Sequence, residues 1–247
     1  MHQQTNEESA LIEWFIALGI GLAVSMAIYF VAFSIMVMIT KRKGSEANVA
    51  LVNPWMSSII VSPIVLLLSL AAIFMFGSTQ LDLWGFQLVP YETLSLLSIV
   101  GLTIAAITVG LSERLSPTPQ KMNPPSATRE RIVFFFVIVI LASVSEEVLF
   151  RGFFQSILDR TLLLSIDFGL FSLTAGALVS ALLFSLVHIA PAKQMGGSIF
   201  VLMGSAFILG LVAGIFLTYS GSLLPSIILH VEFNLIGFAL GIRKLKE

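Results

Sequence analysis

Cysteine is absent from this chain of 247 residues, and charge is scarce. Without cysteine there can be no disulfide, thiolate metal ligand or cysteine nucleophile. Asp, Glu, Lys and Arg make up 11% of the residues, whereas a soluble domain typically carries about a quarter. The net charge of −1 provides no basic surface for a nucleic acid. We therefore expect little water-facing surface and no nucleic-acid partner.

Long apolar runs dominate the sequence instead. Hydrophobic residues make up 57% of the chain, and about 20 apolar residues in a helix cross a bilayer core. Such runs are expected to be helical because lipid offers no partner for unpaired backbone groups. The predicted spans are Trp14–Ile39, Met56–Phe76, Leu94–Leu111, Ile132–Ile157, Leu170–Ala190, Ile199–Leu217 and Leu223–Ile242. The predicted fold class is an all-α, polytopic membrane helical bundle of about seven transmembrane helices.

The spans are expected to form one membrane-embedded domain, residues 1–247. Residues 14–111 contain three spans without intramembrane charge, and residues 132–242 contain four spans that hold all of it. Residues 1–13 are polar and acidic and lack the features of a cleaved signal peptide. The first span is therefore expected to remain in the protein.

Lysine and arginine gather in alternate loops, which predicts the orientation. They follow the first, third, fifth and seventh spans: Lys41, Arg42, Lys43, Arg114, Lys121, Arg129, Arg131, Lys193, Arg243, Lys244 and Lys246. The other loops hold only Arg160. An integral, multi-pass protein with a cytoplasmic C-terminus is expected, in a prokaryotic plasma membrane. A re-entrant segment at Leu162–Phe171 would change the number of spans.

Several ionisable side chains fall within or near the later spans: Glu146, Glu147, Arg151, His188, His230 and Glu232. Intramembrane charge is costly unless it is paired or hydrated, so it indicates a functional site. Glu147 and Arg151 are four residues apart and can meet on one helical face, as can His230 and Asn234. Glu146 lies about 100° around the helix from Glu147, so the two need not share a partner. We expect Glu147 to pair with Arg151, leaving Glu146 free to accept a proton.

Two carboxylates, two imidazoles and an amide suit hydrolysis by an activated water. A carboxylate can act as general base, and a histidine can hold the water. A second imidazole and an amide NH₂ can donate to the oxyanion that develops on the scissile carbonyl. The same residue types also ligate zinc, with Glu146, His188 and His230 as the candidate ligands. The residues alone leave both routes open, one without a cofactor and one with a divalent metal.

Three short motifs carry a family resemblance. Glu146-Glu147-Val148-Leu149-Phe150-Arg151 resembles the EExxxR motif of the CAAX protease and bacteriocin-processing family, also called the Abi family. Phe184–His188 resembles its FxxxH motif, and His230–Asn234 resembles its HxxxN motif. The motifs occur in this order on separate apolar spans, and the resemblance covers roughly Ile132 to Leu240.

The resemblance implies an all-helical intramembrane endopeptidase that hydrolyses a peptide bond near the membrane surface. It implies that Glu146 is the general base and that His188 positions the water. His230 and Asn234 would form the oxyanion hole. The remaining motif residues, Glu147 and Arg151, would order the site.

The same resemblance implies partners. Substrates would be peptides or lipidated proteins, surrounded by membrane lipids. The family was first classed as metalloproteases, and a metal-free glutamate mechanism is the competing account. Eukaryotic-type members tend to have a further helix after the third motif, whereas seven residues follow Leu240 here. Closure of the bundle in a homodimer is one expectation that follows.

Two other functions fit the same polar set. One is a proton-coupled transporter, in which Glu and His relay protons, although no internal repeat supports it. The other is a non-catalytic membrane scaffold with a role in bacteriocin immunity. Substrate cleavage separates the peptidase from both.

Other conspicuous residues have structural interpretations. Phe184 is expected to shape a cavity wall, and Asp159 with Arg160 to mark the solvated end of the fourth span. Glu232 lies about 200° from His230 on a helix, which predicts that it faces a loop, the membrane interface or a subunit contact. The glycine pairs are interpreted as sites of close helix packing: Gly210 with Gly214, and Gly237 with Gly241.

Overall fold

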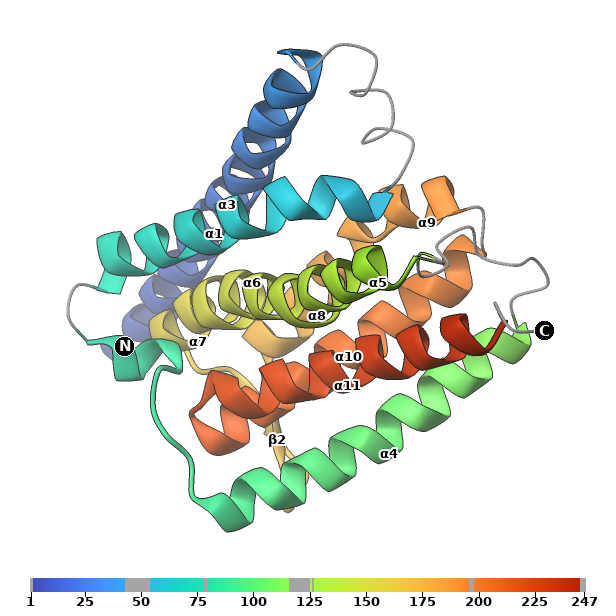
Figure 1. The fold of residues 1–247 in the computed structure, drawn as a ribbon. Helices are drawn as coiled ribbons and strands as arrows, with labels where there is room; N and C mark the ends of the chain where they lie inside the picture. Colours follow the sequence, from blue (N-terminus) through green and yellow to red (C-terminus); the bar gives the residue numbers. More distant parts are fainter. Residues whose placement is uncertain are drawn as a thin grey trace.

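The computed structural model describes residues 2–42, 54–77, 80–115, 125, 127–195 and 198–244. Within these residues, seven helices are long and apolar enough to cross a membrane: Ser9–Lys41, Trp55–Gly77, Tyr91–Leu115, Thr128–Thr161, Ala175–Lys193, Ile199–Ser220 and Leu223–Arg243. The predicted all-α membrane bundle is confirmed. Its first helix begins and its last helix ends at opposite ends of the bundle (Figure 1), as an odd number of spans requires. Lys43, Lys121 and Lys246 of the predicted basic clusters lie outside the described residues.

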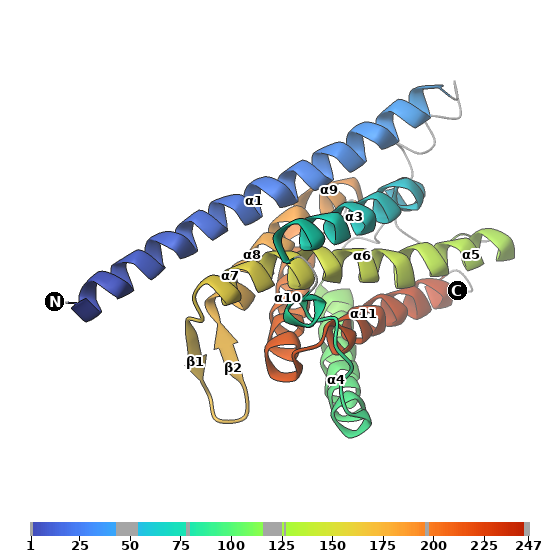
Figure 2. The same ribbon diagram turned by 90° about the vertical axis from the view of Figure 1, so that its left-hand side faces the viewer.

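Three long helices precede the part of the chain that carries the motifs. They are α1 (His2–Arg42), α3 (Pro54–Gly77) and α4 (Tyr91–Leu115), with the short 3₁₀ helix η2 (Leu81–Trp84) before α4. α1 packs along α3, whereas α4 packs on the C-terminal helices. Figures 1 and 2 both show α1 and α4 on opposite sides of the bundle.

The fourth span is one continuous helix with two widened stretches. In order it comprises α5 (Thr128–Phe134), η3 (Phe135–Ala142), α6 (Ser143–Glu147), η4 (Val148–Gln155) and α7 (Ser156–Thr161). The segments η3 and η4 are π-helical, a conformation that often occurs at functional sites. Both flank the two adjacent glutamates at the end of α6. Backbone carbonyls of both segments accept side-chain hydrogen bonds from other helices.

A β-hairpin connects the fourth and fifth spans. Strands β1 (Ser165–Asp167) and β2 (Ser172–Thr174) are antiparallel, with Ser165 opposite Thr174. The fifth span therefore begins at Ala175, and the predicted start at Leu170 is wrong. The Thr174 side chain caps α8 by accepting a hydrogen bond from Ala177 N at 3.0 Å, which ends the strand and begins the helix.

The last helices are α8 (Ala175–Val187), α9 (Ile189–Met195), α10 (Ile199–Ser220) and α11 (Leu223–Lys244). A tight connection at Gly221, whose φ of 67° suits glycine, joins α10 to α11. Gln87 Nε2 donates to Gly221 O at 2.7 Å, and Leu223 N donates to Gly85 O at 2.9 Å. These bonds fix the beginning of α11, and so the position of His230 two turns later.

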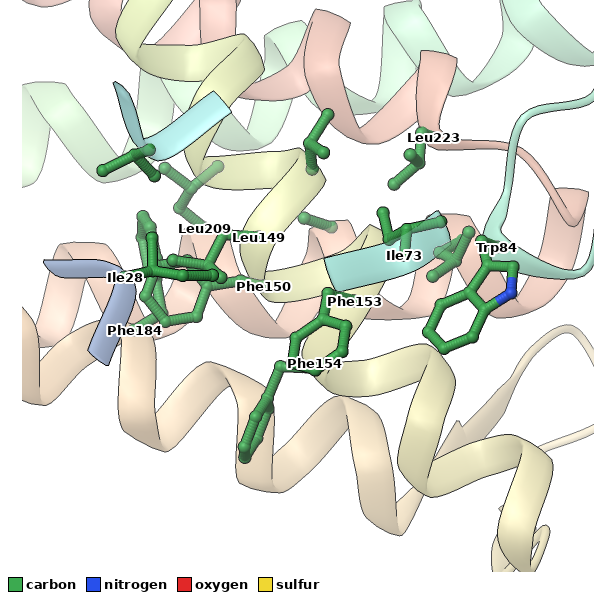
Figure 3. Packing of buried hydrophobic residues seen from close by; sticks show 14 of the residues in the cluster. Ile28, Ile73, Trp84, Leu149, Phe150, Phe153, Phe154, Phe184, Leu209 and Leu223 are labelled. Carbon is green, nitrogen blue, oxygen red and sulfur yellow. The ribbon is translucent and has the colours of Figure 1, made fainter. Parts of the chain in front are cut away.

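Aromatic side chains fill the core around η4. Phe150, Phe153 and Phe154 are fully buried there, and Figure 3 shows them between Phe184 and Trp84. Phe153 stacks on Trp84 with ring centroids 6.1 Å apart. This packing holds the helix of the EExxxR motif at the centre of the bundle.

Candidate active site

Glu147 connects two of the three motifs. Its side chain is 0% exposed, and its Oε2 lies 3.3 Å from Nε of the equally buried Arg151. Its Oε1 lies 2.8 Å from His230 Nδ1 on α11. The predicted pairing of Glu147 with Arg151 is present, and it extends to the histidine of the third motif. A buried carboxylate with two cationic or donor partners is a fixed element of a site.

Glu146 lies beside the same imidazole but remains accessible. Its side chain is 25% exposed, and its Oε2 is 3.9 Å from His230 Nε2. Within the described residues, no hydrogen bond holds this carboxylate. The two nitrogens of His230 therefore face two carboxylates: that of Glu147 is buried and paired, and that of Glu146 is partly exposed. That sharing of a partner was not expected from the sequence.

Phe184 contacts both histidines. Its ring centroid is 4.5 Å from that of His188 and 5.6 Å from that of His230. The Arg151 guanidinium carbon lies 4.8 Å from the same centroid, a cation–π distance. Phe184 therefore packs against side chains of all three motifs.

His188 terminates α8 and is half-buried. Its Nδ1 lies 2.8 Å from Phe184 O. Because a carbonyl oxygen only accepts, Nδ1 carries the hydrogen in this contact and Nε2 is left as an acceptor. In the described part of the chain, His188 makes no hydrogen bond or ion pair with Glu146.

Asn234 holds α11 against the fourth span. Its Nδ2 donates to Ile138 O at 3.2 Å and to Ser143 Oγ at 2.9 Å. Both amide hydrogens are therefore engaged, and the carbonyl of Ile138 belongs to the π-helical segment η3. The structure places Asn234 next to the helix of the first motif, one turn from His230.

A polar line continues along the fourth span beyond the motif. Gln155 is fully buried, and its Nε2 donates to Gly214 O at 3.1 Å, Thr218 Oγ1 at 3.2 Å and Asp159 Oδ2 at 3.2 Å. Asp159 also accepts from Thr174 Oγ1 at 3.0 Å. The prediction of a solvated helix end is wrong for Asp159, whose carboxylate is held by these bonds and has a buried Oδ1, whereas Arg160 is exposed. Glu147, Arg151, Gln155 and Asp159 are spaced four residues apart. This spacing places them on one helical face, so the sequence could have predicted the polar line.

Two glycines on α10 make room for this polar line. A Cβ atom on Gly210 would lie 2.9 Å from Arg151 Nη2, and one on Gly214 would lie 2.9 Å from Gln155 Oε1. The same two glycines approach Ala181 and Ala177 on α8. Close helix packing is therefore only part of their role, since they also accommodate buried polar side chains. A Cβ on Gly237 would meet nothing within 4 Å, so close packing does not explain that glycine.

Glu232 is partly buried in the middle of α11, where its side chain lies against α4 rather than at a loop or at the membrane interface. Its Oε2 is buried without a hydrogen bond within the described residues, and a Cβ on Gly101 of α4 would lie 2.8 Å from it. A loop or the membrane interface is therefore the wrong location for Glu232, whereas the subunit contact stays a prediction. The opposite face of α11 from His230 is covered by α4, which sequence periodicity does not reveal.

The metal route requires ligands that converge. In the part of the chain that the structure describes, no group of three His, Asp or Glu side chains is placed to hold a metal ion. His188 Nδ1 and His230 Nδ1 are each engaged by another residue, which leaves Nε2 of each ring as the potential ligand atom. The described residues do not gather Glu146, His188 and His230 into a three-ligand set, and the metal route stays a prediction.

Comparison with known families gives one match. Residues 128–236 match the family model described as Type II CAAX prenyl endopeptidase Rce1-like. The matched segment includes all three motifs, from the two glutamates to Asn234. Searches of curated proteins and of solved structures find no match to the chain.

Proposed function

Because residues 128–236 belong to the CAAX protease family, we propose that this chain is an intramembrane endopeptidase in which Glu146 activates the attacking water. The family predicted from the three motifs is confirmed by the match. A peptidase in a multi-pass membrane protein follows from the family and the seven apolar helices. The identity of the base, the route without a metal and the substrate are our proposals.

One observation carries the assignment of the base. His230 stands between two carboxylates, of which Glu147 is fully buried and paired while Glu146 is 25% exposed. A general base must reach the water whose proton it takes. Glu146 is the carboxylate with that access. Glu147 has its oxygens directed at Arg151 and His230 and acts as a positioning residue.

The proposed reaction follows from these positions. Glu146 takes a proton from a water molecule that His188 Nε2 helps to orient, and the water oxygen attacks the carbonyl carbon of the scissile peptide bond. The oxyanion that forms accepts a hydrogen bond from Nε2–H of a His230 ring that carries both hydrogens, while its Nδ1–H donates to Glu147 and so fixes the ring. Glu146 then passes its proton to the leaving nitrogen as the C–N bond breaks. The products are a new carboxyl end and a new amino end.

Asn234 has a conditional part in this scheme. Both of its amide hydrogens are bonded to the fourth span. It joins the oxyanion hole only if substrate binding releases one of them. In the state described it positions α11, and with it His230.

Access to the site is proposed from the cytoplasmic side. His188 lies at the end of α8 that leads to Lys193, and the basic loops mark the cytoplasmic face. This orientation also places the C-terminus of the protein in the cytoplasm. The substrate is proposed to be a peptide or lipidated protein presented at that surface.

The test uses purified protein in liposomes with two membrane-tethered peptides, one ending in a prenylated cysteine and one without the prenyl group. Glu146→Gln should lower the cleavage rate by about 10²- to 10⁴-fold, the usual contribution of a general base. Glu232→Gln is the matched control, because it changes another intramembrane glutamate on the far face of α11 and should cleave at the parental rate. Undiminished cleavage by Glu146→Gln removes the assigned base.

A second experiment tests whether cleavage requires a metal ion. The chelator-treated enzyme is expected to keep its full rate. Loss of cleavage that added zinc restores would overturn the metal-free route. Comparison of the two peptides decides whether the prenyl group is required.

A further inference from the structure

The connection between α7 and α8 is a folded hairpin with its own turn. Phe168 N donates to Phe171 O at 2.9 Å, and the rings of these two residues stack 5.2 Å apart. Gly169 has a φ of 82°, and its N–H donates to Asp167 Oδ1 at 2.8 Å. These bonds define the turn, and the strand register aligns Ile166 with Leu173.

Most of the exposed side chains of the hairpin are apolar. Its exposed large hydrophobic residues are Leu163, Leu164, Ile166, Phe168, Leu170 and Phe171. Leu170 at the turn is 87% exposed. The only charged residue from 162 to 174 is Asp167, whose Oδ1 accepts from the turn. A contiguous apolar surface of this kind marks an interaction site.

The two faces of the strands differ in polarity. Side chains alternate between faces along a strand, so Ile166 and its partner Leu173 share one face. Ser165, Asp167 and their partners Ser172 and Thr174 share the other. The apolar face is continuous with the apolar turn. The hairpin therefore has a polar face, an apolar face and an apolar tip.

The position of the hairpin identifies what covers this surface. It starts directly after the span that ends at Thr161, and it ends directly before the span that begins at Ala175. Both ends are therefore held at one membrane surface, and Figure 2 shows the hairpin projecting from the helix ends. Thr174 Oγ1 also donates to Asp159 Oδ2 at 3.0 Å, which fastens the hairpin to α7.

We propose that the hairpin at residues 162–174 inserts its tip and apolar face into the adjacent bilayer leaflet, as a lipid-binding element separate from the peptidase site. A peptide that added a strand to β1 or β2 would cover a backbone edge and leave the tip exposed. The hydrocarbon of a bilayer leaflet, in contrast, would cover both the apolar tip and the apolar face. The polar face stays at the headgroup level, where segments with one apolar and one polar side are stable.

The absence of cysteine from the chain makes a direct depth measurement straightforward, because each introduced cysteine is the only labelling site. Leu170→Cys and Ile166→Cys place a nitroxide label on the tip and the apolar face, and Ser165→Cys places one on the polar face. Glu92→Cys, in the first turn of α4, is the water-exposed reference on the same side of the membrane. Leu102→Cys, 49% exposed within α4, is the reference inside the bilayer.

The full-length labelled proteins are reconstituted in phosphatidylcholine liposomes at high lipid-to-protein ratio. Collision rates with molecular oxygen, which concentrates in the bilayer, and with a water-soluble nickel complex give the depth of each label. We expect the Leu170 and Ile166 labels to match Leu102 and to collide at least 5-fold less with nickel than Glu92. The Ser165 label should lie between the two references.

Two results would overturn the proposal. The first is nickel accessibility at Leu170 equal to that at Glu92, which places the tip in water. The second is a Leu170 label that is immobilised and shielded from both reagents, which indicates a protein partner or a second copy. Phe168→Cys repeats the tip measurement if Leu170→Cys fails to reconstitute. Peptide cleavage is not used as the readout, so this result is independent of the proposed peptidase activity.

Discussion

The first three spans and the four later spans satisfy their buried polar groups in different ways. In the described residues of α1, α3 and α4, the buried polar side chains are hydroxyls: Ser25, Thr40, Ser62, Ser69 and Thr108. Thr40 and Ser69 donate to their own helices, as Ser69 Oγ does to Val65 O at 2.6 Å. In the later spans, Glu147, Gln155 and Asn234 instead bond to other helices. Local bonds leave a helix free to rotate, whereas bonds between helices fix their mutual positions.

This difference has a functional consequence. A catalytic site needs side chains from several helices held within a fraction of an ångström. The later spans supply the charged and amide groups that fix rotation and depth together, and α4 adds a hydroxyl contact between Ser112 and Ser205 of α10. The earlier spans contribute packing, and Gly101 of α4 accommodates Glu232. The comparison predicts large effects of substitution at bonds between helices and small effects at bonds within one helix.

The largest effect is expected for Arg151→Met. Glu147 would then be a fully buried carboxylate without its guanidinium partner, which typically destabilises a protein by about 3–5 kcal/mol. Thermal unfolding of the detergent-solubilised protein measures the loss. The double variant Glu147→Gln with Arg151→Met should recover much of the stability, because no charge is left unpaired. A double variant as unstable as the single one contradicts the ion-pair explanation.

Gly214→Ala should have the next largest effect. The added Cβ would lie 2.8 Å from Ala177 Cβ and 2.9 Å from Gln155 Oε1, and overpacking typically costs about 1–3 kcal/mol. Gly110→Ala in α4 is the matched control, since a Cβ there meets nothing within 4 Å. The control should be neutral or stabilised by up to about 1 kcal/mol through helix propensity. Equal destabilisation of both variants would contradict the view that Gly214 is needed to make room for Ala177 and Gln155.

Gln155→Met tests the polar line with a side chain of similar size. It removes hydrogen bonds to Gly214 O, Thr218 Oγ1 and Asp159. At roughly 0.6 kcal/mol for each bond within a membrane protein, a loss of about 1–2 kcal/mol is expected. Chemical unfolding in detergent measures it, and a neutral result would mean that the line contributes nothing to helix packing.

Ser69→Ala should have the smallest effect. The hydroxyl of Ser69 bonds to Val65 O in its own helix, and that carbonyl keeps its backbone partner. We expect a change of about 0.6 kcal/mol or less in the same unfolding measurement. A loss of stability as large as that of Gln155→Met would contradict the distinction between hydrogen bonds within one helix and hydrogen bonds between helices.

Local features of the site were predictable from the sequence, and contacts between helices were not. Glu147 and Arg151 are four residues apart on one helix, so their contact follows from helical geometry. The bond from His230 to Glu147 joins residues 83 positions apart. Its existence depends on how α11 is rotated, and periodicity does not show rotation when all faces of a helix are apolar. The same reason explains the wrong location of Glu232.

The start of the fifth span shows a second limit. Leu170, Phe171 and Leu173 extend the hydrophobic pattern of α8, so composition placed this segment in the span. The structure assigns them to the hairpin, because Thr174 caps the helix and Gly169 permits the turn. Both residues are turn or cap signals that the apolar run obscured.

The sequence by itself determined the seven apolar spans, the order of the three motifs and the pairing of Glu147 with Arg151. These depend on helix length, residue type and spacing within one helix. The tertiary structure alone decided that His230 lies beside both carboxylates and that Phe184 packs against both imidazoles. It also decided that Gly210 and Gly214 make room for Arg151 and Gln155. Because lipid tails are as apolar as the side chains, the hydrophobic effect does not favour one rotation of a helix about its axis. Packing and hydrogen bonds between helices determine that rotation instead.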